Sequence, residues 1–140
     1  TNTDLEPVAR HGKKPQILQF NNEKEELSAI KKLIVTHQAS AYKSLGIVCK
    51  TESQAYEMAE KLQIPDIHFL SNQSSAFVQG IVITSAHMAK GLEFNEVIIP
   101  QVDDKNYHSE IDRSMLYVAA TRAMHRLTLT YSGTKHTPFI

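Results

Sequence analysis

Short apolar runs that alternate with segments of helical periodicity constrain the fold of this 140-residue chain more than any other feature. Three of these runs are apolar enough to be strands buried on both faces of a sheet. A fourth, near the end of the chain, alternates apolar and polar residues, as a strand with one less buried face does. The expected strands span residues 16–20, 45–49, 67–70, 80–84, 95–100 and 127–131. Strands separated by helices predict an α/β fold with a mostly parallel sheet.

Three helices are expected between these strands, and each begins at a pair of residues typical of a capping box. In such a pair a polar side chain and an acid or amide three residues later satisfy the first N–H groups of the helix. The pairs are Asn22 with Glu25, Thr51 with Gln54, and Ser109 with Asp112. From these pairs the helices are expected to run to about residues 36, 62 and 123.

Composition indicates one globular domain and limits its partners. Fifteen Lys and Arg balance fifteen Asp and Glu, which argues against a freestanding nucleic-acid binder held by bulk charge but permits a few placed phosphate contacts. The single Cys49 predicts a reducing, cytoplasmic setting. No apolar run approaches the ~18 residues of a membrane span, so no membrane partner is expected. Residues 16–131 are the predicted domain, between an irregular N-terminal segment (1–15) and a C-terminal tail (132–140).

Several common catalytic patterns are absent from the sequence. It contains neither the GxxxxGK[ST] pattern of a phosphate-binding P-loop nor GxGxxG. Its seven His residues show no HxxxH or HExxH spacing, so no metal site is expected. Asp103 and Asp104 follow an apolar run, but solvated loop residues are the favoured interpretation.

Residues 84–94, which connect two expected buried strands, are the first segment that could carry chemistry. Small and polar residues at the end of a strand let a ligand approach the backbone, and Gly91 permits left-handed geometry. An ordinary connection that ends a helical turn at a glycine explains the same residues.

Residues 112–123 are the second such segment. The expected helix is apolar nearly all round, which indicates burial, yet it contains Arg122. A buried guanidinium needs an anionic partner. Glu93 or Asp112 could provide one within the domain, and a phosphate from outside would fit the planar guanidinium equally well. The residues alone leave both alternatives open.

Taken together, these segments resemble conserved motifs of superfamily 1 helicases of the UvrD/Rep type. HMAKGLEF at 87–94 resembles motif V, LYVAATRA at 116–123 resembles motif VI, and IVCKT at 47–51 resembles motif IV, in the same order and spacing. The resemblance covers about residues 17–131 and looks closest to the HelD (helicase IV-like) branch. Only residues 63–79 stand where UvrD and Rep carry a large 2B subdomain.

The resemblance implies a RecA-like three-layer α/β/α domain, the second (2A) domain of such a motor. The first RecA-like domain of the same protein would carry the P-loop and bind most of the ATP and Mg²⁺. The matching residues are Arg122 as the arginine finger and catalytic residue, Lys50, Gly91 and Glu93 as further ATP-binding residues, and Ser85 and His87 as contacts to single-stranded DNA. Lys50 stands where the family usually has an arginine, which keeps the charge but loses the bidentate fork.

The expected function is therefore the C-terminal motor domain of an ATP-dependent DNA helicase or translocase, inactive as an isolated chain. One alternative is the motor of a HelD-like ATPase that releases RNA polymerase, which would make the polymerase a partner. The other is a non-catalytic interaction module.

Overall fold

The computed structural model describes residues 14–71 and 79–140, which form one six-stranded parallel sheet with helices on both faces. The helices are α1 (Glu23–Gln38), α2 (Glu52–Leu62) and α3 (Glu110–Ala120). The strands are β1 (Gln16–Phe20), β2 (Ser44–Cys49), β3 (Ile67–Phe69), β4 (Gly80–Ser85), β5 (Phe94–Ile99) and β6 (Ala123–Ser132). Their order is β1-β6-β5-β2-β4-β3, and every pair is parallel. The α/β prediction is confirmed.

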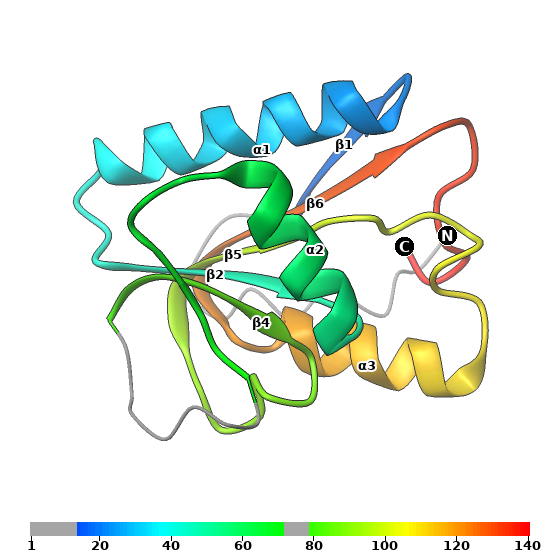
Figure 1. Ribbon diagram of the computed structural model, residues 1–140. Helices are drawn as coiled ribbons and strands as arrows, with labels where there is room; N and C mark the ends of the chain where they lie inside the picture. Colours follow the sequence, from blue (N-terminus) through cyan, green and yellow to red (C-terminus); the bar gives the residue numbers. More distant parts are fainter. Residues whose placement is uncertain (1–13, 72–78) are drawn as a thin grey trace.

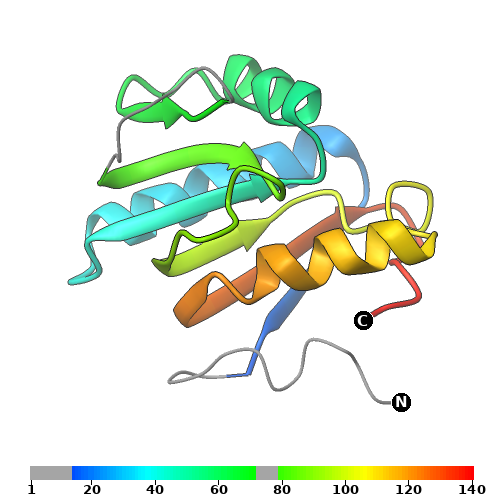
Figure 2. The same ribbon diagram turned by 90° about the horizontal axis from the view of Figure 1, so that it is seen from below.

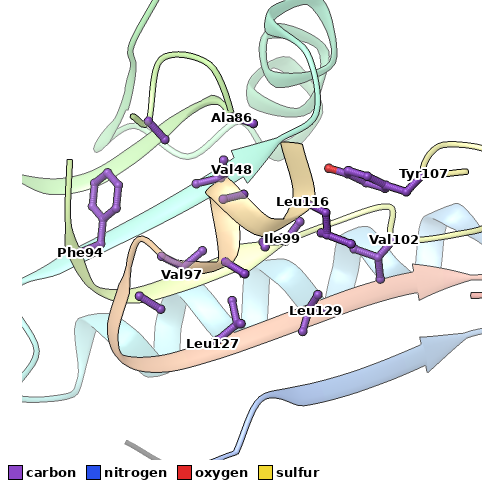
Figure 3. Packing of buried hydrophobic residues seen from close by; sticks show 14 of the residues in the cluster. Val48, Ala86, Phe94, Val97, Ile99, Val102, Tyr107, Leu116, Leu127 and Leu129 are labelled. Atoms are coloured by element: carbon purple, nitrogen blue, oxygen red, sulfur yellow. The ribbon is translucent and has the colours of Figure 1, made fainter. Parts of the chain in front are cut away.

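Two apolar clusters hold the three layers together. On one face, α1 and α2 cover the sheet, and on the other α3 crosses β5 and β6 (Figures 1 and 2). Ile30, Ile34 and Met58 belong to the first cluster. In the second, Leu116 of α3 packs among strand residues such as Val97 and Leu129 (Figure 3). This arrangement is the expected α/β/α sandwich.

The expected helix caps are present. The Asn22 side chain accepts a hydrogen bond from the Glu25 N–H. Thr51 with Gln54, and Ser109 with Asp112, form complete capping boxes in which each side chain bonds the other residue's backbone N–H. Because capping depends on residues only three positions apart, the sequence predicts it reliably. The expected N-terminal segment 1–15 falls largely outside the described residues.

The predicted end of the last helix is wrong. α3 ends at Ala120 rather than near residue 123, and β6 begins at Ala123 rather than at 127. The cause is strand pairing, because the Phe94 N–H donates to the Arg122 carbonyl over 2.9 Å and Phe94 pairs with Ala123. Arg122 therefore lies in the turn between helix and strand.

The expectation that α3 is buried all round is also corrected. Its sheet-facing residues, such as Leu116 and Ala119, are buried, but Ile111 is 71% exposed and Tyr117 49% exposed. One helix on this face packs against the sheet along a single side, so the opposite side, which carries Glu110, Arg113 and Ser114 besides these two apolar residues, faces outward. α3 is thus a surface helix.

The C-terminal tail is pinned to the loop that precedes α3. The Thr137 N–H donates to the Val102 carbonyl over 2.8 Å, and the Thr137 hydroxyl donates to the Tyr107 carbonyl over 2.7 Å. Phe139 and Ile140 pack against the second cluster. The tail therefore fixes the segment from which α3 starts.

Gly46→Ala is expected to destabilise the fold. A Cβ atom at this position of β2 would lie 2.6 Å from the Phe94 ring, and overpacking of this kind costs about 1–3 kcal/mol. Urea denaturation of the chain measures the loss. In a Phe94→Leu background the same change is expected to cost less, because the ring is absent; an equal cost in both backgrounds would contradict this contact as the cause.

Candidate functional site

The two segments singled out by sequence meet at the edge of the sheet where β5 and β6 begin. Leu92 and Glu93 directly precede β5, and Arg122 directly precedes β6. These strands are parallel neighbours, so their first residues lie side by side. The Arg122 Nη1 donates to the Leu92 carbonyl over 3.3 Å. Residues thirty positions apart in the sequence thus form one site at the amino edge.

The Arg122 guanidinium is half-buried and bound by neutral oxygen atoms. Its Nε donates to the Val118 carbonyl over 3.1 Å, and its Nη2 donates to the Thr121 hydroxyl over 3.0 Å. A guanidinium has five N–H donors, and three take part in these bonds. One N–H on Nη1 and one on Nη2 take no part in these three bonds.

Gly91 turns the chain toward the start of β5. Its φ is +82°, in the left-handed region, and a Cβ atom there would meet nothing within 4 Å. The backbone conformation, and not crowding, is what favours glycine here. The expected left-handed geometry is confirmed. Gly91 and Glu93 are both exposed beside Arg122.

Ser85 and His87 lie at the other edge of the sheet. Ser85 is the last residue of β4, and its buried hydroxyl accepts a hydrogen bond from the Met88 N–H over 3.2 Å. His87 is exposed. Of this pair, His87 therefore presents its side chain to an external ligand.

A single crossover joins the two edges. Residues 86–93 run from the carboxyl end of β4 past β2 to the amino end of β5 (Figure 2). Helix-like bonds stiffen it, from the Ala89 N–H to the Ser85 carbonyl and from the Leu92 N–H to the Ala89 carbonyl, each 3.0 Å long. The residue expected to contact DNA and the residue that binds Arg122 thus belong to one short, internally bonded segment.

A groove lies between this crossover and α3. It has a volume of about 260 Å³ and is lined by His87 and Lys90 on one side and by Ile111, Met115 and Val118 on the other. Val118 also supplies the carbonyl that binds Arg122. The groove therefore extends along α3 from the expected DNA-contacting residue toward the arginine.

Lys50 does not lie with the other expected ATP-binding residues. It follows the carboxyl end of β2, whereas Arg122 precedes β6 in the same parallel sheet. Since β2 is six residues long, the two edges are roughly 20 Å apart. The Lys50 Nζ donates to the Asn106 carbonyl over 2.6 Å and to Asp112 Oδ1 over 3.3 Å. Its charge therefore holds β2 to the start of α3.

Asp112 is the centre of this second network. It accepts hydrogen bonds from the His108 and Ser109 N–H groups over 3.0 and 3.1 Å, besides the bond from Lys50. Burial raises the pKa of the Asp112 carboxyl, but these hydrogen bonds outweigh it and lower the pKa to about 2. Asp112 therefore anchors the first turn of α3 and is not the partner of Arg122.

Two further buried acids were missed by sequence reasoning. Glu96 bonds His37 Nδ1 over 2.5 Å and Arg126 Nη1 over 3.0 Å. Glu26 accepts from the Thr130 hydroxyl over 2.6 Å and thereby ties α1 to β6. Glu96 had a detectable signal, a charge within an apolar strand run. Glu26 had one as well, because it lies four residues before Ile30 and eight before Ile34, on the apolar face of α1.

The remaining candidate chemistry is limited. Among residues 14–71 and 79–140, no group of three or more His, Cys, Asp or Glu is placed to hold a metal ion. Within the same residues, no helix is both long and apolar enough to cross a membrane. Burial, with a smaller contribution from the nearby Glu26 charge, raises the pKa of the Cys49 thiol to about 12, so the thiol stays protonated.

The sequence of this chain is similar to those of known helicases. The sequence model of the UvrD-like helicase C-terminal domain matches residues 70–134. DNA helicase II from Escherichia coli K12 is 29% identical over 107 residues, which cover 64% of this chain and 15% of that protein. Gabija protein GajB from Bacillus cereus VD045 is 43% identical over 58 residues, which cover 41% of this chain and 12% of that protein. The chain thus spans 15% or less of these relatives.

Solved structures show the same architecture. The C-terminal domain of a possible DNA helicase from Lactobacillus plantarum WCFS1 has a TM-score of 0.79 and 25% identity, covering 94% of this chain and 81% of that chain. The UvsW helicase from bacteriophage T4 shares the fold at a TM-score of 0.57 and 11% identity, covering 82% of this chain and 46% of that one.

Asp112→Asn is expected to destabilise the chain in a pH-dependent way. The folded-state pKa of about 2 lies below the ordinary 3.8, so the carboxylate's contribution is complete above pH 4 and disappears as pH falls toward 2. At pH 7 the expected loss is about 1.5–3 kcal/mol, the usual value for a hydrogen bond to a charged group. Thermal unfolding at pH 7, 4 and 2.5 measures it.

The matched control is Glu110→Gln, which removes an exposed acid from the same helical turn. It is expected to leave stability nearly unchanged at every pH. A deficit of the Asp112 variant that stays constant from pH 7 to 2.5 would contradict the assignment.

Proposed function

Because this chain belongs to the UvrD-like helicase C-terminal domains of superfamily 1, we propose that it is the second RecA-like motor domain of an ATP-dependent DNA helicase or translocase. The observation that carries the proposal is the junction of Arg122 with Leu92 at the amino edge of the sheet. This junction places a half-buried guanidinium beside the exposed Gly91 and Glu93.

Arg122 is the proposed arginine finger. The N–H groups that remain on Nη1 and Nη2 can donate to the oxygen atoms of a phosphate. When the first RecA-like domain closes on this edge with ATP bound, Arg122 would stabilise the negative charge that spreads over the transferring phosphoryl group. Such fingers are worth roughly 10³–10⁵ in rate.

Other residues of this edge would bind the rest of the nucleotide. The exposed Glu93 carboxylate can accept hydrogen bonds from ribose hydroxyls, and Gly91 leaves open space beside it. Lys50 is not included, because the sheet separates it from Arg122 and its ammonium already binds Asp112. We assign Mg²⁺ to the first RecA-like domain, together with the P-loop that would hold most of the ATP.

Single-stranded DNA would bind at the opposite edge, at Ser85 and His87. Ser85 would contribute its backbone, since its hydroxyl faces the crossover turn. Because the crossover continues to Leu92, a displacement at His87 reaches the residue that binds Arg122 through one stiff segment. The opening and closing of the two domains during ATP hydrolysis would thereby change how tightly this domain binds single-stranded DNA.

Arg122→Ala, introduced into the protein that carries both RecA-like domains, is expected to lower kcat for ATP hydrolysis by about 10³–10⁵-fold. ATP binding is expected to change little, because the first domain supplies most of it. Steady-state hydrolysis and equilibrium binding of a labelled nucleotide measure the two effects. Arg113→Ala removes an exposed arginine from α3 and is the control. A near-normal kcat in the Arg122 variant would refute the proposal.

The isolated chain is expected to show no ATP hydrolysis, because its sequence has no GxxxxGK[ST] P-loop. Phosphate release by purified chain, compared with a preparation of Arg122→Ala, measures this. Turnover that is present in the first and absent from the second would assign a complete active site to this chain.

Release of RNA polymerase is the second candidate activity. The short connection from α2 to β4, residues 63–79 with β3 inside it, favours the HelD-like branch over a UvrD-type arrangement with its inserted subdomain. Strand unwinding and displacement of polymerase from a nucleic-acid template, measured side by side with the protein carrying both domains, separate the two activities. Loss of both in Arg122→Ala would exclude a non-catalytic module.

A further inference from the structure

We propose that Thr121 is a positioning residue for Arg122, one that holds the guanidinium in the orientation in which its remaining N–H groups reach the phosphate. This inference rests on the proposed function, because it requires Arg122 to reach a phosphate. Thr121 would not touch the nucleotide and would act only through the arginine.

The hydroxyl of Thr121 occupies a closed arrangement at the end of α3. It donates to the Val118 carbonyl over 2.8 Å and accepts from the Arg122 Nη2 over 3.0 Å. The Arg122 Nε donates to the same Val118 carbonyl over 3.1 Å. Because the single hydroxyl proton is used toward Val118, an oxygen lone pair is turned to the guanidinium. Nε and Nη2 of the guanidinium are thereby both bound.

The crossover fixes the guanidinium from another direction. Nη1 donates to the Leu92 carbonyl over 3.3 Å. With Nε, Nη1 and Nη2 each bound once, the plane of the group is set by contacts to Val118, Leu92 and Thr121. One N–H of Nη1 and one N–H of Nη2 are left by these bonds, and each can donate to a phosphate oxygen.

Holding the group in this way lowers the cost of reaching the transition state. A flexible arginine side chain loses conformational entropy each time it binds the phosphate. A side chain already held by hydrogen bonds has lost that entropy beforehand. Val118 and Leu92 contribute backbone carbonyls, which substitution does not remove. Thr121 is the only one of the three whose contact depends on its own side chain.

The test compares four variants of the protein that carries both RecA-like domains: Thr121→Val, Thr121→Ser, Arg122→Ala, and Thr121→Val with Arg122→Ala. Thr121→Val keeps the shape and removes the acceptor, so kcat is expected to fall roughly 10- to 100-fold, the usual effect of a small misplacement. KM for ATP is expected to stay within about threefold. Thr121→Ser keeps the hydroxyl and is expected to retain most of kcat.

The double variant decides whether Thr121 acts through Arg122. If it does, Thr121→Val adds no further loss once the arginine is gone, because effects of residues that act as a unit are not additive. If the two losses multiply, or if Thr121→Ser is as poor as Thr121→Val, the inference is overturned. An unchanged kcat in Thr121→Val overturns it directly.

Thr36→Val is the matched control. Thr36 lies exposed on α1, and its hydroxyl donates to the Lys32 carbonyl over 3.0 Å without binding an arginine. Its kcat is expected to match that of the unmodified protein. Should Thr121→Val unfold at the assay temperature, Thr121→Ala removes the same acceptor and replaces it in the comparison.

The failure of this inference differs from the failure of the proposed function. A near-normal kcat in Arg122→Ala refutes the arginine finger itself. A large loss in Arg122→Ala with a normal kcat in Thr121→Val keeps the finger and removes only the positioning role of Thr121.

Discussion

The hydrogen bond from the Phe94 N–H to the Arg122 carbonyl is the contact on which the candidate site depends. It begins the parallel pairing of β5 with β6. Because this pairing ends α3, Arg122 lies in the turn after the helix and not within it. The same pairing brings Leu92 within hydrogen-bonding distance of the guanidinium. The Phe94 ring, which fills the space above Gly46 in the centre of the sheet, secures this strand end. Backbone pairing, more than side-chain chemistry, thus places the arginine.

Strand direction explains how the remaining residues are distributed. In a parallel sheet all amino ends share one edge and all carboxyl ends share the other. Residues that precede strands, such as Glu93 and Arg122, therefore gather on one side of the molecule. Residues that follow strands, such as Lys50 and His87, gather on the other. The crossover at 86–93 connects the two edges, while Asp112 fastens α3 at the carboxyl edge.

Local features of the sequence predicted much of this fold. The three helix starts were correct because capping involves residues close in the chain, and the apolar runs located the strands. The end of α3 was not predictable from local sequence, because an apolar helical pattern continues through Ala123 and only pairing with β5 interrupts it. The separation of Lys50 from Arg122 could have been deduced from the sequence, because Lys50 follows an expected strand whereas Arg122 precedes the next strand of the same parallel sheet. Two of the three partners of Arg122 could not, because the carbonyls of Val118 and Leu92 belong to the backbone, which every residue type shares.

Because the thiol of Cys49 is buried, the chain is well suited to site-specific labelling with spectroscopic probes. Cys49 is the one cysteine of the 140-residue sequence, and it lies fully buried with its pKa raised to about 12. Maleimide dyes react with an accessible thiolate, so they would not label Cys49 while the domain is folded. A cysteine placed on the outward side of α3, for example at the exposed Ile111, would then take a single label without removal of the native residue.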